Sequence, residues 1–307
     1  MQSPRPVYGF LLALLTAVLW GVLPIFLKIC LQAMDAATIT AYRFLFAAVF
    51  VLGVLAWQKK LPRRPQFTKT TVAWIAFAAV MLVLNYVTNV IGLMYLNPET
   101  VQVVMQLAPF LLMLGGVVIF KEVFTRFQYI GAAVLLSGMA LFFNQRLHSI
   151  AASASEDTVG LFIIIFAATA WAIYALAQKP LLNSFSPQQC TLLMYTCGFV
   201  LLAPLTDFTR INTLTLFQAG ALLFCCMNTI IAYGAFTEAM QVWSTSKVSA
   251  VIATGPVFTY LAMSLAVAYD PAQFAHSELD TLAYVGAIMV ITGSIMTSLG
   301  KKKPKMS

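Results

Sequence analysis

The chain is divided almost from end to end into apolar stretches that are long enough to cross a lipid bilayer. A membrane helix needs about 20 mostly apolar residues. We predict ten such helices, at residues 7–29, 38–57, 72–94, 101–120, 127–144, 159–180, 187–206, 215–238, 247–268 and 281–299. Charged residues make up only 9% of the 307, whereas ordinary globular domains carry roughly 25%. The sequence therefore predicts an all-α polytopic membrane protein.

The basic residues are distributed unevenly between the predicted loops. With the N-terminus inside, the outer loops hold only Arg146 and Arg210. The inner side then holds Arg5, Lys59, Lys60, Arg63, Arg64, Lys69, Lys121, Arg126, Lys301, Lys302, Lys303 and Lys305. Because cytoplasmic loops are enriched in Lys and Arg, we expect a bacterial inner (cytoplasmic) membrane protein with both termini in the cytoplasm. The same placement explains the net charge of +8 by the membrane surface, so we expect no nucleic-acid binding.

The second half of the sequence repeats features of the first at nearly constant spacing. A spacing of 151 pairs Gly9 with Gly160, Trp20 with Trp171 and Lys28 with Lys179; 147 pairs Tyr86 with Tyr233, Val101 with Val248 and Pro109 with Pro256; 155 pairs Gly131 with Gly286 and Gly138 with Gly293. Five helices is an odd number, so the second copy must cross the membrane in the opposite orientation. Such inverted repeats are typical of transporters. We predict two inverted five-helix repeats, at residues 1–147 and 148–307.

These repeated residues also carry a family resemblance. The tryptophan late in the first helix of each half, the prolines in the fourth and ninth helices, the glycine pairs and the sequence Phe120-Lys121-Glu122 resemble EamA-type transporters of the drug/metabolite transporter superfamily. The resemblance covers nearly the whole chain. It implies that helices one to four and six to nine surround a central cavity, with the fifth and tenth packed outside. It further implies transport, mostly export, of amino acids, metabolites or drugs.

Polar and aromatic side chains inside the predicted helices are the candidates for a substrate site. Polar groups in hydrocarbon usually face the bundle interior or a water-filled cavity. We select Trp20, Asn85, Tyr86, Asn89, Gln102, Gln106, Trp171, Tyr174, Asn228 and Tyr233 as residues that line a central pocket. The alternative is that the amides join helices and that the aromatic residues pack or lie at the membrane interface. For the four amides of the third and fourth helices we favour the pocket.

Arg43 is also a candidate, although its position admits two interpretations. It lies about five residues into the second helix, roughly 8 Å at 1.5 Å per residue. Snorkelling to the lipid headgroups explains both Arg43 and Lys28, and we favour it. In the alternative, Arg43 lies in an outer vestibule, where it pairs with Asp35 or Glu99 as a gate or holds a substrate carboxylate.

Pro109, Pro256 and Glu122 are predicted to act in gating or as hinges, although for Glu122 we favour the alternative of an inner-surface cluster with Lys121 and Arg126. A proline has no N–H to donate, so Pro109 frees the carbonyl near Met105 and Pro256 the carbonyl near Ile252. Glu122 closes the fourth helix, but the corresponding position of the second half is occupied by Tyr269. We therefore expect the two gates to differ.

Several absences narrow the function. No Asp, Glu or His falls near the middle of a predicted span, which favours facilitated export or exchange over obligatory proton antiport. The five cysteines lack metal-binding spacing, and enzyme motifs are missing, so we expect no enzyme, metal or cofactor. We predict a secondary transporter that exports small polar or amphipathic, amino-acid-like metabolites by alternating access. The alternatives are a multidrug exporter and a membrane sensor or scaffold without transport.

The glycine pairs of the fifth and tenth helices carry one further expectation. Each pair is two turns apart, so both glycines lie on one face and allow close helix packing. We expect this packing within one subunit. The sequence also allows a homodimer through the same two helices.

Overall fold

The computed structural model is built from helices. It describes residues 6–120, 125–142, 156–243, 248, 251–271, 274 and 280–299. The α-helices are α1 (Pro6–Cys30), α2 (Ala36–Trp57), α3 (Lys69–Tyr95), α4 (Pro98–Met105), α5 (Leu107–Phe120), α6 (Arg126–Phe142), α8 (Glu156–Leu181), α9 (Pro187–Leu202), α10 (Leu216–Val242), α12 (Gly255–Tyr269) and α13 (Thr281–Leu299). Short 3-10 helices are η1 (Arg64–Gln66), η2 (Ala203–Leu205) and η3 (Phe208–Thr213).

Length and composition make this a multi-pass membrane protein. Six helices of the described ranges are long and apolar enough to cross a bilayer, namely α1, α2, α3, α8, α9 together with η2, and α10. Three shorter apolar helices lie at Arg126–Phe142, Gly255–Tyr269 and Thr281–Thr297. The predicted all-α polytopic class is confirmed, and most predicted spans match an observed helix within a few residues.

Two of the predicted spans are interrupted. A turn at Gln106 divides the span at 101–120 into α4 and α5. In the second half Ile252 is helical, a turn follows at Ala253, and α12 begins at Gly255. The repeat spacing of 147 carries position 106 to 253. Each break lies within three residues of Pro109 or Pro256, because a proline removes one helical hydrogen bond and clashes with the preceding turn. Our predictions of single helices at 101–120 and 247–268 are therefore wrong.

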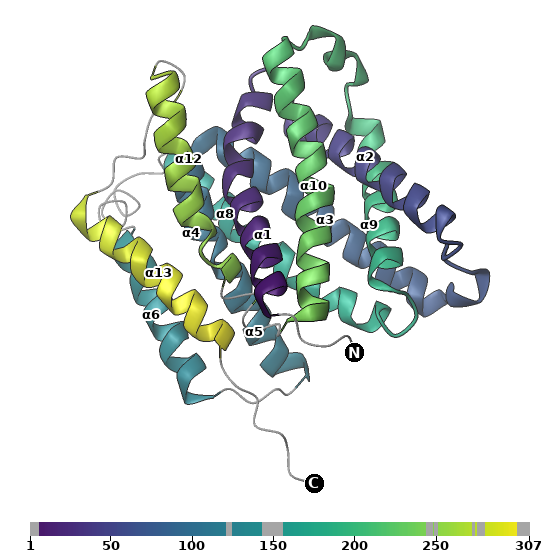
Figure 1. The fold of residues 1–307 in the computed structure, drawn as a ribbon, viewed down its shortest axis with the longest axis horizontal. Coiled ribbons are helices and arrows are strands. Elements are labelled where there is room, and N and C mark those ends of the chain that lie inside the picture. Colours follow the sequence, from purple (N-terminus) through teal and green to yellow (C-terminus); the bar gives the residue numbers. More distant parts are fainter. Residues whose placement is uncertain are drawn as a thin grey trace.

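The helices pack in pairs drawn from both halves of the chain. The largest interfaces join α6 to α13, α3 to α8, α1 to α10 and α2 to α9. In Figure 1, α6 and α13 lie together at one edge of the bundle, and α2 and α9 lie toward the other. By predicted order, these pairs are helices five and ten, three and six, one and eight, and two and seven. Exchanging the two halves leaves this set of pairs unchanged.

The predicted glycine pairs bring α6 and α13 into close contact within one chain. A Cβ added at Gly138 would lie 2.7 Å from the Met289 Cβ, and one added at Gly293 would lie 2.7 Å from the Gly131 carbonyl oxygen. Real Cβ atoms do not approach other atoms so closely. The glycine faces thus make the intramolecular contact that we expect, and a homodimer stays a prediction.

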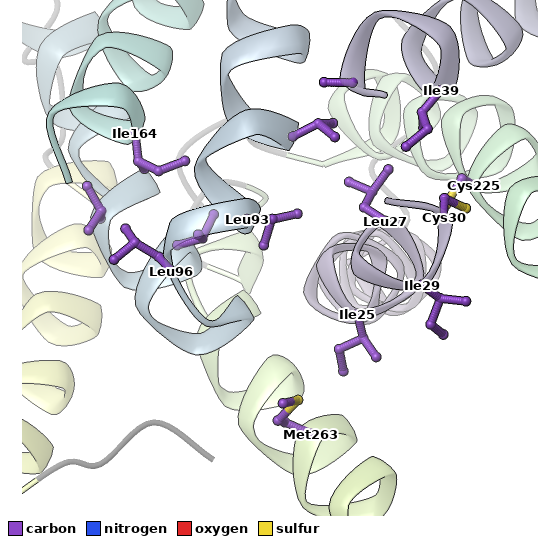
Figure 2. Close-up of a cluster of buried hydrophobic side chains, with 14 of the residues drawn as sticks. Ile25, Leu27, Ile29, Cys30, Ile39, Leu93, Leu96, Ile164, Cys225 and Met263 are labelled. Atoms are coloured by element: carbon purple, nitrogen blue, oxygen red, sulfur yellow. The ribbon is translucent and has the colours of Figure 1, made fainter. Parts of the chain in front are cut away.

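A large apolar cluster of buried side chains lies at one end of the bundle, and Figure 2 shows part of it. It gathers the C-terminal ends of α1 and α3 and the N-terminal ends of α2, α8 and α10, with side chains that include Leu27, Ile39 and Leu93. This end lies opposite the N-terminus of α1. Cys30 of α1 contacts Cys225 of α10 there.

Candidate functional site

A cavity of about 330 Å³ lies between the helices of both halves. This is within the usual range for small-molecule sites, roughly 300–1,000 Å³. Its lining comes from α1, α2, α3, α4, α5, α8, α10 and the start of α12, and none of its lining residues belongs to α6 or α13. Leu27 and Val101 belong both to the lining and to the apolar cluster of Figure 2, so that cluster forms the wall at one end of the cavity.

Nearly all the predicted substrate-site residues line this one cavity. They are Trp20, Arg43, Asn85, Tyr86, Asn89, Gln102, Gln106, Trp171, Asn228 and Tyr233. Tyr174 is the exception, because it packs behind the lining in a second buried cluster with Leu181 and Met194. Our placement of Tyr174 in the pocket is therefore wrong. Its aromatic ring fills the interface between helices.

The predicted gating residues are placed less completely. Pro256 is buried at the first position of α12, next to Gly255, which lines the cavity. Pro109 lies in α5, one residue after the lining residue Ala108. Glu122 lies outside the described residues. A gate at these positions stays a prediction.

Arg43 lies inside the protein rather than at the membrane surface. It is only 4% exposed and belongs to the cavity lining. Its Nε donates a hydrogen bond to the Thr229 Oγ1 at 3.1 Å, and its guanidinium carbon lies 4.7 Å from the centroid of the Tyr86 ring. A cation over an aromatic face is stabilised by the ring quadrupole. The snorkelling that we favour from the sequence is therefore wrong for Arg43.

The acidic residues expected near Arg43 have other positions. Asp35 caps α2, where its carboxylate accepts hydrogen bonds from the Thr38 N–H at 2.9 Å and the Thr38 hydroxyl at 2.6 Å. Glu99 lies in the first turn of α4 and is 4% exposed, although the sequence places it in an outer loop. Within the described ranges, no carboxylate pairs with the Arg43 guanidinium.

Lys28, the second cation that we expect at the headgroups, is half-buried at the end of α1. Its Nζ donates to the Asn97 Oδ1 at 3.2 Å. This contact joins the end of α1 to the residue that precedes α4, and Lys28 is not part of the cavity lining.

The cavity amides also connect helices. The Nδ2 of Asn85 donates to the Ala167 carbonyl at 2.9 Å, and the Nδ2 of Asn228 to the Leu19 carbonyl at 2.6 Å. The Oε1 of Gln106 accepts from the Ser294 hydroxyl of α13 at 3.0 Å. Lining a pocket and joining helices, which we treat as alternatives from the sequence, are thus compatible roles of the same amides. These bonds fix the amides in place, so the polar groups of the wall are preorganised.

Pro24 is a cavity residue that the sequence analysis does not select. It lies inside α1, and its ring leaves the Trp20 carbonyl, four residues earlier, without its helical donor. The Gln102 Nε2 of α4 donates to that carbonyl at 2.6 Å. The sequence holds a signal for the contact between Gln102 and the Trp20 carbonyl. It is a proline within one apolar span and an amide without an assigned partner on another.

Aromatic rings supply another part of the wall. Trp20 makes an edge contact with Tyr233, with ring centroids 5.3 Å apart, and a tilted contact with Phe236 at 5.7 Å. Tyr233 also meets Tyr195 edge-on at 6.3 Å. The cavity therefore combines one cation and several amides with an aromatic surface, which suits a small amphipathic solute.

Comparison with known proteins gives the family. The model of the EamA-like transporter family matches the chain twice, at residues 7–144 and 158–299. The chain belongs to the EamA-like transporter family. It is 38% identical over 302 residues to an uncharacterized transporter of Haemophilus influenzae, covering 98% of both chains. It is also 38% identical over 297 residues to the uncharacterized inner membrane transporter YhbE of Escherichia coli, covering 96% of this chain and 92% of the other.

A solved structure is also similar to this chain. A crystal structure is similar with a TM-score of 0.63 over 95% of this chain and 98% of that chain, at 16% sequence identity. At this identity the likeness concerns the fold alone. The family match and the named relatives indicate that the chain is a membrane transporter. They confirm the resemblance to EamA-type transporters.

Proposed function

We propose that the protein is a secondary transporter of the bacterial inner membrane that exports small polar or amphipathic, amino-acid-like metabolites by alternating access. One observation carries this proposal: a single cavity is lined by amides, aromatic rings and Arg43 from helices of both halves. A sensor or scaffold needs no such polar cavity between its helices. A relative named as an inner membrane transporter supports the membrane assignment.

We further infer that the two halves are inverted repeats. Their helix pairing is unchanged when the halves are exchanged, and the family model matches each half separately. Two hydrogen bonds, in which the donor and acceptor positions are exchanged, support the same relation. Asn85 of α3 donates to the Ala167 carbonyl of α8 at 2.9 Å, and the Thr16 hydroxyl of α1 lies 3.3 Å from the Ala232 carbonyl of α10. The spacings of 147 and 151 convert one pair of positions into the other.

Alternating access requires each end of the cavity to open in turn. The cluster of Figure 2 is the closed gate at one end, which the charge distribution assigns to the periplasmic side. The breaks before Pro109 and Pro256 supply hinges, since the segments on either side of each break can tilt separately. Opening therefore separates the end of α1 from α2, α3 and α10.

Export is tested first with cells and vesicles. Metabolites are compared between cells with and without the protein, and the species that changes is offered to inside-out membrane vesicles. The proposal expects protein-dependent accumulation inside those vesicles, and none in vesicles that lack the protein. Accumulation only in right-side-out vesicles would make the protein an importer. Absence of transport in both orientations would favour the sensor or scaffold.

The gate is tested with Cys30, which is 1% exposed in this closed end. A variant that keeps Cys30 as its only cysteine is treated from outside with a membrane-impermeant maleimide. Alternating access predicts slow labelling whose rate changes when the transported solute is present. No labelling under any condition would contradict an opening at this gate.

A multidrug exporter is the second candidate, and the aromatic contacts of Trp20 favour it. Exporters of this kind accept bulky apolar cations, which a buried Arg43 opposes by charge repulsion. Resistance of expressing cells to cationic dyes and antibiotics distinguishes the two. Raised resistance to several such compounds would support the multidrug function.

A further inference from the structure

Arg43 carries an inference that rests on the proposed function and specifies its substrate. The guanidinium is 4% exposed within a membrane-spanning bundle, and no carboxylate pairs with it in the described ranges. Tyr86 and Thr229, its two neighbours, are both uncharged side chains. A buried charge is costly unless it is paired, and within membranes such residues usually mark a substrate pathway. The cavity wall therefore holds one uncompensated positive charge.

The hydrogen-bond donors of Arg43 are only partly used. Arginine has five N–H donors in a planar fork, and the bond from Nε to Thr229 is the one hydrogen bond of this side chain in the described part of the protein. Because Arg43 lines the cavity, the remaining donors are available to a solute there. A planar fork of this kind matches the two oxygens of a carboxylate or a phosphate.

A hydrogen-bond acceptor lies next to Thr229, the partner of Arg43, in the sequence of α10. Asn228 precedes Thr229, lines the same cavity, and its Oδ1 is buried without a partner among the described residues. Its Nδ2 is held by the Leu19 carbonyl at 2.6 Å. Turning the amide over would place two oxygens against each other, so this orientation is fixed. The wall thus holds, besides the cation, a buried acceptor that no described donor satisfies.

We propose that the cavity selects solutes that bear an anionic group, a carboxylate or a phosphate, and that Arg43 binds this group. An amino or hydroxyl group next to the anion then faces the acceptor of Asn228. Before the solute arrives, the Tyr86 ring and the Thr229 hydroxyl hold the guanidinium in place. Binding supplies the countercharge that the described residues around Arg43 do not supply.

The test uses inside-out vesicles and a small-molecule extract of bacterial cells as the probe. Mass spectrometry identifies each species whose accumulation depends on the protein, and thereby shows whether it carries a carboxylate or a phosphate. That species is then compared with its own neutral analogue, in which the carboxylate is converted to an amide or the phosphate is removed. We expect the wild-type protein to transport the anion at least about tenfold better than the analogue.

Variants assign the preference to one residue. Arg43→Gln should lower transport of the anion at least about tenfold, mainly through KM, and change that of the analogue little. Arg43→Lys should keep part of the preference, since it retains the charge without the fork. Lys28→Gln is the matched control, because it removes a half-buried cation that does not line the cavity, and it should keep the preference.

Three results would overturn parts of this account in different ways. Equal transport of anion and analogue by the wild-type protein would overturn the anion preference while leaving transport intact. An Arg43→Gln protein with a lowered melting temperature and equal losses for both solutes would make Arg43 structural. Absence of protein-dependent uptake from the extract would overturn the proposed function, and this inference with it.

Discussion

The two halves of the chain differ most sharply where α2 and α9 face the centre of the bundle. Each helix begins with a side chain that caps its own N-terminus, Asp35 in α2 and Ser186 in α9, and these caps are 151 residues apart. The same spacing relates Arg43 to Met194. Arg43 lines the cavity, whereas Met194 is fully buried in an apolar cluster.

The partners of Arg43 and Met194 also differ in polarity. Arg43 bonds to Thr229, and the repeat spacing of 147 relates Thr229 to Leu82. Leu82 and Met194 both belong to the second buried cluster. The contact that corresponds to Arg43 and Thr229 in the repeat is therefore apolar. The helix arrangement is therefore the same on both sides, whereas the polar contact is present on one side only. The cavity is asymmetric because Arg43 lines it, whereas Met194 lies in a packed core.

Moving the charge to the apolar side should have the largest effect. Met194→Arg would bury a cation where the surrounding side chains supply no countercharge, at a cost of about 3–5 kcal/mol. We expect little folded protein in the membrane and a strongly lowered melting temperature in detergent. The reverse change, Arg43→Met, removes an uncompensated buried charge and should leave the melting temperature equal or higher. If both variants were equally unstable, the comparison of the two interfaces would fail.

Closing the glycine notches of α6 and α13 should have the next largest effect. In Gly138→Ala the new Cβ meets the Met289 Cβ at 2.7 Å, and in Gly293→Ala it meets the Gly131 carbonyl oxygen at 2.7 Å. Overpacking of this kind costs about 1–3 kcal/mol. Since the two notches are related by the repeat, the two variants should lower the melting temperature by similar amounts. A large difference between them would make this interface asymmetric too.

Sequence reasoning reached the helices and most of the cavity because both depend on simple periodic constraints. Apolar length marks the spans, and polar groups inside them must face protein or water, which brings Asn85 and Gln102 to one wall. It failed where tertiary contacts decide. Tyr174 has the same chemistry as Tyr233, but it packs among side chains of α3 and α9 and lies outside the cavity lining.

Arg43 shows why depth along a helix is not sufficient. Its position near the predicted start of a span fits snorkelling, because the distance to the headgroups is short. Whether the side chain points to lipid or inward depends on the rotation of α2 about its axis. The neighbours that hold it inward, Tyr86 and Thr229, lie on other helices. That rotation is fixed by interhelical packing, which a single sequence does not contain.

Two hydrogen bonds at repeat-related pairs of positions, both donated from the first half to the second, should differ in strength. Asn85→Ala removes a bond of 2.9 Å to Ala167 and leaves a buried carbonyl with one acceptor site unused, at a cost of about 1 kcal/mol. Thr16→Val should cost less, about 0.5 kcal/mol, because the Thr16 hydroxyl already donates to Leu12 of its own helix at 2.9 Å. Unfolding in mixed micelles measures both. A larger loss in Thr16→Val would reverse this ranking of the two bonds.

The last expected effect is a small gain in stability, and it concerns the lengths of α2 and α9. Gly53 continues α2, whereas the spacing of 151 places Pro204 at the corresponding position, where α9 has given way to η2. A Cβ at Gly53 would contact nothing within 4 Å. Gly53→Ala should therefore stabilise α2 by about 0.5–1 kcal/mol through lower backbone entropy in the unfolded chain. Gly220→Ala in α10, equally open, is the matched control. A gain at Gly220 alone would mean that the end of α2 keeps its helical backbone when the bundle unfolds, and that its extra length over α9 depends on local preference rather than on packing.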